Sequence, residues 1–118
     1  MHTSSLSAEE AFELLQHGNE RYASGQCTHP HQTGQRRLQV LAGQQPIAAI
    51  LSCSDSRVPV ELIFDMGIGD LFIIRNAGNV VDDVVLASIE YAVEHLGVSL
   101  VLVLGHTQCG AVTAAVAG

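Results

Sequence analysis

The chain has 118 residues, of which 47% are hydrophobic and 14% are charged. This length supports one domain, and the composition predicts a buried core and argues against disorder. The formal net charge of −7, with only five Lys and Arg residues, argues against a nucleic-acid partner, because phosphate binding requires clustered cations. The sequence contains no uninterrupted apolar run of about 18 residues, so we expect no transmembrane span and no membrane partner.

The N-terminal part of the chain is predicted to be a helical arm, at about residues 1–43 of a single domain that spans 1–118. Ser7 and Glu10 have the spacing of a capping box, in which each side chain bonds to the backbone of the other residue. Apolar residues then recur at helical spacing, which predicts a helix over 8–23. A polar loop and a second, short helix complete the arm.

The rest of the chain alternates short apolar runs with helical patterns. The apolar runs have the length of buried strands, and we expect them at 46–53, 71–74 and 99–104. Pro59 suits the first turn of one intervening helix, and Asp82 or Asp83 caps the next. This order predicts an α/β fold with a parallel sheet of about three strands and flanking helices.

Reactive side chains follow two of these predicted strands. Cys53, Asp55 and Arg57 come where the first strand ends, and His106 and Cys109 follow the third. In open parallel sheets, chemistry takes place just outside the carboxyl ends of the strands. Thiolates and imidazole are preferred zinc ligands, so Cys53, His106 and Cys109 form a candidate Cys₂His zinc site.

Asp55 has two possible roles at such a site. It could complete a closed tetrahedral site as the fourth ligand of Zn²⁺. Alternatively, it could pair with Arg57, since alternate residues of an extended segment point to one side and a forked guanidinium suits a carboxylate. Water would then occupy the fourth position, and zinc would lower its pKa to about 7.

Three motifs in order resemble those of a known family. They are Cys53-Ser54-Asp55-Ser56-Arg57, Arg75-Asn76-Ala77-Gly78-Asn79 and Gly105-His106-Thr107-Gln108-Cys109-Gly110. Together they resemble the β-class carbonic anhydrases, and the match begins in the first helix, at Gly18-Asn19-Glu20-Arg21-Tyr22. The resemblance implies a carbonate dehydratase, a lyase that reversibly hydrates carbon dioxide to bicarbonate.

The resemblance also implies roles for the site residues. Zn²⁺ would be held by Cys53, His106 and Cys109, and zinc-bound hydroxide would attack carbon dioxide. Asp55, held by Arg57, would accept a hydrogen bond from the hydroxide and orient it. In the family this aspartate can also move onto zinc and give an inactive closed form.

Further family positions concern the substrate pocket. The resemblance implies a substrate-binding role for five residues, of which some would act in the site of a neighbouring subunit: Gln44, Phe72, Ala77, Tyr91 and Gly110. We therefore expect a homodimer or a higher homo-oligomer. Two of the three cysteines belong to the candidate metal site, which favours a reducing compartment, and we expect a cytoplasmic protein.

The resemblance covers the N-terminal two-thirds of the family pattern. We expect a truncated version of the fold, in which the strand at 99–104 lacks the neighbour that would cover its edge. This leaves two alternatives to carbon dioxide hydration. One is a non-catalytic, zinc-binding assembly module of the same fold, and the other is a hydrolase of a carbon dioxide analogue such as carbon disulfide.

Overall fold

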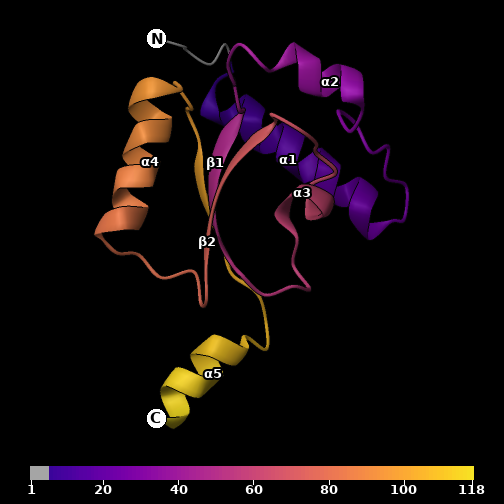
Figure 1. Cartoon of the computed structure of the whole chain (residues 1–118). Coiled ribbons are helices and arrows are strands. Elements are labelled where there is room, and N and C mark those ends of the chain that lie inside the picture. Colours follow the sequence, from indigo (N-terminus) through magenta and orange to yellow (C-terminus); the bar gives the residue numbers. More distant parts are fainter. Residues whose placement is uncertain (1–5) are drawn as a thin grey trace.

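The computed structural model describes residues 6–118, so the first five residues of the predicted arm lie outside the described residues (Figure 1). Helices and strands alternate after the arm, as predicted. The elements, in chain order, are α1 (Ala8–Ala23), α2 (Gly34–Gln39), β1 (Ala48–Cys53), α3 (Val60–Ile63), β2 (Leu71–Asn76), α4 (Asp83–His95), β3 (Val101–Leu104) and α5 (Gly110–Ala117). Among residues 6–118, no helix is both long and apolar enough to cross a membrane.

The three strands form one parallel sheet in the order β2-β1-β3. All six residues of β1 are buried, because this strand has a neighbour at each edge and helices on both faces. Cys53 is in register with Asn76 at the end of β2, and Ser52 is in register with Leu104 at the end of β3. The predicted α/β fold with a parallel sheet is confirmed. The carboxyl ends of all three strands lie along the same side of the sheet.

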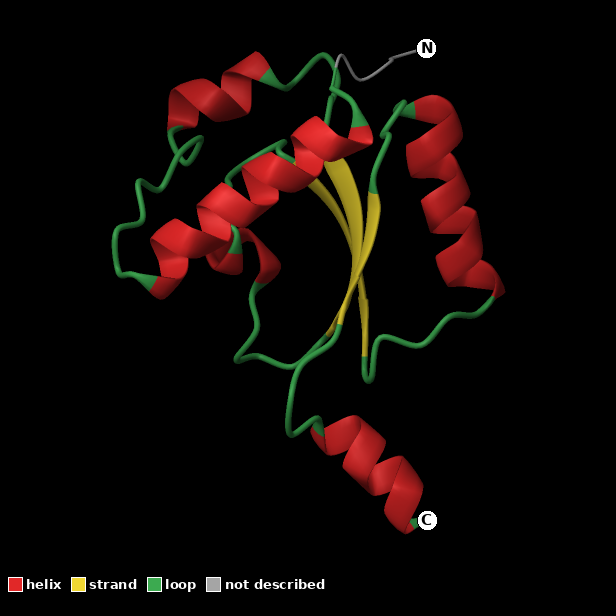
Figure 2. Cartoon of the chain, turned by 180° about the vertical axis from the view of Figure 1, so that it is seen from behind, coloured by secondary structure: helices red, strands yellow, loops and turns green. Residues whose placement is uncertain are grey.

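Helices cover both faces of the sheet (Figures 1 and 2). On one face, Leu15 of α1 packs with Ile50 of β1 and with Val60 of α3. On the other face, Ala92 of α4 and Leu96 pack against β1. The last helix, α5, extends away from this body at the carboxyl edge of the sheet (Figure 1).

Local sequence signals fix the start of the two longest helices. Ser7 and Glu10 form the predicted capping box, with Glu10 N donating to Ser7 Oγ at 3.1 Å and Ser7 N donating to Glu10 Oε1 at 2.9 Å. Asp82 and Asp83 were both possible N-caps of α4. The N-cap is Asp82, whose side chain accepts a hydrogen bond from Val85 N at 2.9 Å. β2 extends two residues beyond its predicted end, because its pairing with β1 continues to Asn76.

The buried carboxylate of Asp65, which follows α3, joins the N-terminal segment to the rest of the fold. The Asp65 side chain is 1% exposed and accepts from Arg21 Nε at 2.6 Å. It also accepts from the backbone N–H groups of Thr28 at 2.9 Å and His29 at 3.0 Å. Nearby, a Cβ atom on Gly18 would overlap the Phe64 carbonyl oxygen, so only glycine allows α1 to approach this closely.

Candidate metal centre

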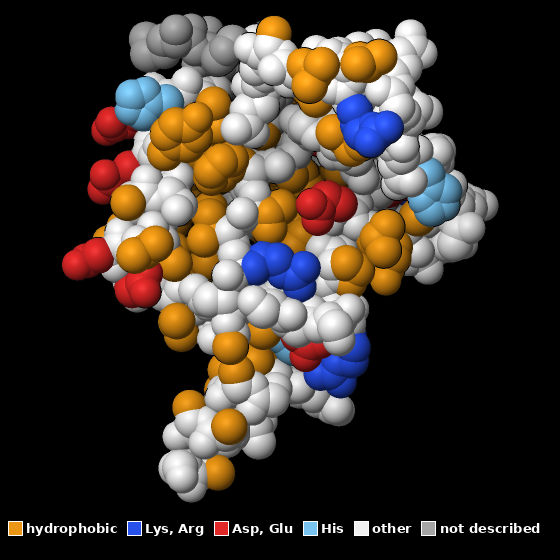
Figure 3. Space-filling model, in the orientation of Figure 1, with side chains coloured by type: hydrophobic (Ala, Val, Ile, Leu, Met, Phe, Trp, Pro, Cys, Tyr) orange, Lys and Arg blue, Asp and Glu red, His pale blue; other side chains and the backbone are white. Residues whose placement is uncertain are grey.

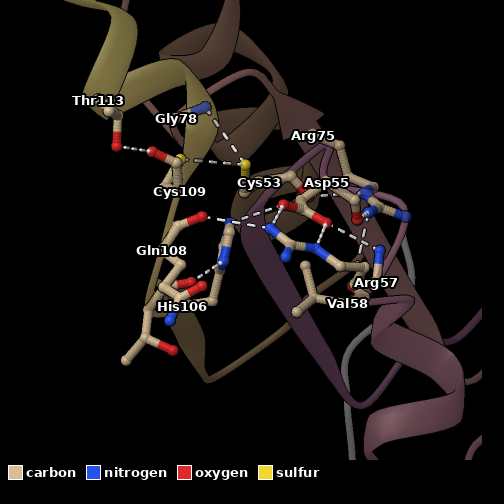
Figure 4. Close-up of polar contacts among 11 residues, drawn as sticks. Cys53, Asp55, Arg57, Val58, Arg75, Gly78, His106, Gln108, Cys109 and Thr113 are labelled. Carbon is tan, nitrogen blue, oxygen red and sulfur yellow. Dashed lines mark hydrogen bonds and ion pairs between the residues drawn. The ribbon is translucent and has the colours of Figure 1, made fainter.

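The predicted zinc ligands come together at the carboxyl edge of the sheet (Figure 4). Cys53 ends β1, His106 follows β3, and Cys109 is the N-cap of α5. Their ligand atoms all lie within 4.8 Å of one another. Parallel pairing of β1 with β3 produces this convergence, because it brings two distant segments of the chain to neighbouring strand ends.

The donor atoms fit a zinc ion. Cys53 Sγ and Cys109 Sγ are 3.8 Å apart. Two thiolates on a tetrahedral zinc, each about 2.3 Å from the metal, are also about 3.8 Å apart. His106 Nδ1 lies 2.8 Å from the Thr107 carbonyl oxygen, which can only accept, so Nδ1 carries the proton and Nε2 has its lone pair free. Among the described residues, this buried Nε2 has no hydrogen-bond partner, as expected of a metal ligand.

The surroundings of Cys53 favour its thiolate. The backbone N–H of Gly78, followed by the His106 side chain and the backbone N–H of Asp55, lowers the pKa of the Cys53 thiol to about 6. The nearby Cys53 sulfur, followed by the Thr107 carbonyl, in turn raises the pKa of His106. Because the thiolate is the form that binds metal, these hydrogen bonds prepare Cys53 to act as a ligand.

Asp55 and Arg57 form a bidentate ion pair beside the candidate metal ligands. Arg57 Nε donates to Asp55 Oδ1 at 3.0 Å and Nη2 donates to Oδ2 at 2.7 Å, while the Arg57 backbone N–H donates to Oδ1 at 2.8 Å. These hydrogen bonds hold the pKa of the Asp55 carboxyl well below its usual range. Asp55 Oδ2 lies 3.8 Å from His106 Nε2. Asp55 therefore pairs with Arg57 in the structure, as one of its two predicted roles requires.

The end of β2 supplies two further contacts that sequence reasoning did not assign. Arg75 Nε donates to the Cys53 carbonyl at 3.0 Å and Arg75 Nη2 donates to the Asp55 carbonyl at 2.9 Å. Gly78 N lies 3.4 Å from Cys53 Sγ. The sequence signal for both was the motif at 75–79, which begins in the last two residues of β2, beside the end of β1.

A small cavity of about 250 Å³ opens onto the metal site. Two of the predicted substrate-binding residues, Ala77 and Gly110, line it together with Cys53, Asp55 and Cys109. Gly110 is the first residue of α5, so its backbone N–H belongs to a helix N-terminus. The cavity is therefore small and lies directly beside the candidate ligands.

The structure does not bring the other three predicted substrate-binding residues to this cavity. Gln44 and Tyr91 line a different cavity, of about 390 Å³, near the amino end of β1. Phe72 is in register with Ala49 and lies against Tyr91, with 5.8 Å between the ring centroids. Within one chain, these residues and the metal ligands lie at opposite ends of the sheet.

The fold and the site together define a class: a parallel α/β protein with a Cys₂His donor set and an Asp–Arg pair at the carboxyl edge of its sheet. Residues 48–118 match the model of a family described as carbonic anhydrase. The chain belongs to the carbonic anhydrase family, and its structural relatives place it in the β class.

Two mycobacterial relatives are about half identical to this chain over the segments that match it. Carbonic anhydrase 2 of Mycobacterium tuberculosis is 53% identical over 107 residues, which cover 91% of this chain and 52% of that protein. The carbonic anhydrase of Mycolicibacterium smegmatis is 50% identical over 104 residues, which cover 88% of this chain and 50% of that protein. The chain thus spans about half the length of the curated relatives it matches.

Solved structures have the same fold. A β-carbonic anhydrase of Sordaria macrospora, described as tetrameric, gives a TM-score of 0.67 at 35% identity and covers 89% of this chain and 53% of its own. One from Aspergillus fumigatus gives 0.67 at 37% identity and covers 89% of this chain and 50% of its own. A carbon disulfide hydrolase gives 0.53 at 24% identity over 86% of this chain and 43% of its own, a level that shows a common fold alone.

Proposed function

We propose that the protein catalyses the zinc-dependent, reversible hydration of carbon dioxide to bicarbonate. The observation that carries this proposal is the Asp55–Arg57 pair, placed beside a Cys₂His donor set and its cavity. A purely structural zinc site needs four ligands and no such pair. The pair therefore favours an enzyme over a zinc-binding assembly module.

Each residue has a distinct role in this proposal. Cys53, His106 and Cys109 would hold the metal, and bound zinc lowers the pKa of water enough to supply hydroxide near neutral pH. Asp55 is ionised at neutral pH, because its pKa lies below the usual range, so it acts only as a hydrogen-bond acceptor. Arg57 engages both carboxylate oxygens and would hold Asp55 as a hydrogen-bond acceptor rather than as a fourth ligand.

We also propose that the working protein is a homodimer or a higher homo-oligomer in the cytoplasm. Gln44, Phe72 and Tyr91 lie far from the metal ligands of their own chain, which supports a role in the site of a second copy. Hydrophobic side chains also gather on the side of the molecule that carries α4, beside several acidic ones (Figure 3). Val84 of α4 is 74% exposed. Three free cysteines agree with a reducing compartment.

Sedimentation tests the assembly proposal. We expect the zinc-loaded chain to sediment as a dimer or larger species at micromolar concentration. A stable, folded monomer with full hydration activity would contradict it, because a single chain does not bring Gln44 to its own metal site.

Stopped-flow measurement of carbon dioxide hydration over pH 6.5–9, on protein whose zinc content has been assayed, tests the function. Activity is expected to rise with pH through a midpoint of about 7 to 8, where the fraction of hydroxide increases. Stoichiometric zinc without activity at any pH would contradict the enzyme and favour the assembly module. Hydrolysis of carbon disulfide in place of hydration would identify the third alternative.

A further inference from the structure

The loop that follows β2, residues 76–80, is closed by one side chain. Asn76 Oδ1 accepts from the Val80 backbone N–H at 2.8 Å, and Asn76 Nδ2 donates to the Val80 carbonyl at 2.8 Å. The Asn76 carbonyl also accepts from Asn79 N at 3.3 Å. The amide side chain of Asn76 therefore fixes both backbone groups of a residue four positions later.

Gly78 lies inside this loop, with a φ of +84°. A methyl group at this position would lie 3.7 Å from Val112 Cγ2 and 3.8 Å from Ala111 Cβ, which is ordinary contact distance. Space therefore does not require glycine here, whereas the left-handed backbone conformation favours it. The loop thus lies against the first turn of α5, the helix whose N-cap is Cys109.

The loop reaches the candidate metal site through the backbone of Gly78. Its N–H points to Cys53 Sγ, with 3.4 Å between nitrogen and sulfur (Figure 4). An N–H donor to a ligand sulfur stabilises the thiolate and withdraws electron density from the metal–sulfur bond. In an unrestrained loop, glycine would let this N–H adopt many orientations. Keeping it directed at the sulfur therefore requires other hydrogen bonds that restrict the loop conformation.

We propose that Asn76 is a positioning residue of the metal site. Its side-chain amide closes the 76–80 loop, keeps the Gly78 N–H on the Cys53 sulfur, and thereby sets the zinc affinity and the electron density on that sulfur. The Asn76 backbone pairs with the end of β1, but its side-chain hydrogen bonds go to Val80 and not to the metal ligands or to the Asp55–Arg57 pair. The inference rests on the zinc site of the proposed function, but it does not require that the site hydrates carbon dioxide.

Three variants separate this role from a general effect on the loop. Asn76→Ala removes both hydrogen bonds to Val80, and Asn76→Asp keeps only the acceptor for the Val80 N–H. The matched control is Val80→Ala, since the Val80 side chain is 58% exposed and the variant keeps the backbone groups that Asn76 binds. Circular dichroism checks that each variant is folded.

Two readouts test the variants without measuring activity. Chelator competition gives the zinc dissociation constant, and the absorption spectrum of Co²⁺-substituted protein reports electron density on the sulfur ligands. Loss of an outer partner of a metal ligand weakens affinity by about 10- to 100-fold, and we expect this for Asn76→Ala. Its sulfur-to-cobalt charge-transfer band is expected at longer wavelength, with Asn76→Asp intermediate and Val80→Ala unchanged.

Unchanged affinity and an unchanged band in Asn76→Ala would overturn the proposal. Equal losses in Asn76→Ala and Val80→Ala would overturn it too, because the loop would then act only through its packing. If Asn76→Ala does not fold, Asn76→Asp decides by the same two readouts. An unmodified chain that binds zinc but does not hydrate carbon dioxide would refute the proposed function and leave this inference standing.

Discussion

Two Asp–Arg pairs in this chain look alike in composition and differ in what surrounds them. Asp55 and Arg57 lie two positions apart, with side chains that are 14% and 64% exposed. Asp65 is 1% exposed and pairs with Arg21, which lies 44 positions earlier and is 34% exposed. Hydrogen bonds lower the pKa of both carboxyls, so the direction of the pKa shift does not distinguish their roles.

The origin of the hydrogen-bond donors does distinguish them. Asp65 accepts from the side chain of Arg21 and from the backbone of Thr28 and His29, so it connects separate segments of the fold. Asp55 receives all three of its donors from Arg57, a near neighbour in the same loop. A carboxylate held by one local partner can act at a site without supporting the fold, whereas Asp65 cannot be released without loosening the N-terminal segment.

The largest expected effect is loss of zinc from a ligand variant, which tests whether Asp55 lies beside a metal site. Cys109→Ser replaces a thiolate ligand with a neutral hydroxyl, so we expect the zinc content to fall from about one ion per chain to near zero and hydration activity to disappear. Cys27→Ser is the matched control, because Cys27 lies near Asp65 rather than the candidate ligands. Elemental analysis and stopped-flow assays measure both variants. Loss of zinc from Cys27→Ser alone would place the metal elsewhere.

The next largest effect is a difference in stability between variants of the two carboxylates, measured as the midpoint of urea unfolding. Asp65→Ala removes a buried charge that joins three segments, so we expect a much lower unfolding midpoint than for the unmodified chain. Asp55→Ala breaks a local and partly exposed pair, and the midpoint is expected to change little. Equal midpoints for the two variants would show that both pairs support the fold, and the distinction between them would be lost.

A smaller effect, on hydration activity alone, is expected when the guanidinium group that holds Asp55 is removed. Arg57→Ala should leave the zinc content near one per chain and lower hydration activity by about 10- to 100-fold, as is typical for loss of an outer partner at a metal site. Arg57→Lys keeps the charge but not the fork, so partial activity is expected. Loss of zinc in Arg57→Ala would assign Arg57 a structural role instead.

Features that depend on neighbouring residues in the sequence could be predicted. The capping box of Ser7 and Glu10 spans one helical turn. The uninterrupted apolar residues of β1 predict a strand that is buried on both faces. The convergence of Cys53, His106 and Cys109 followed from one rule, that parallel strands end at the same edge. The order of the elements and the location of the candidate site were therefore predictable.

Features that depend on distant contacts could not be predicted. Nothing near Asp65 in the sequence indicates that residues 28 and 29 donate to it, since only the folded chain brings these segments together. Gln44 and Tyr91 share a cavity apart from the candidate metal ligands, because the segment before β1 meets α4 there, and periodicity alone does not define that contact. The contact between Gly78 and Cys53 likewise depends on how the 76–80 loop closes.

The smallest expected effect is a pH dependence that belongs to Asp65. Its pKa in the folded chain is lowered, chiefly by the backbone N–H of Thr28, relative to about 3.9 in an unfolded chain. The stabilisation is therefore fully present above the unfolded pKa and is lost as the pH falls towards the folded pKa. The difference in unfolding midpoint between the unmodified chain and Asp65→Asn should stay constant from pH 7 to about pH 5 and narrow below about pH 4. A constant difference down to pH 3 would mean that Asp65 acts through packing rather than through its charge.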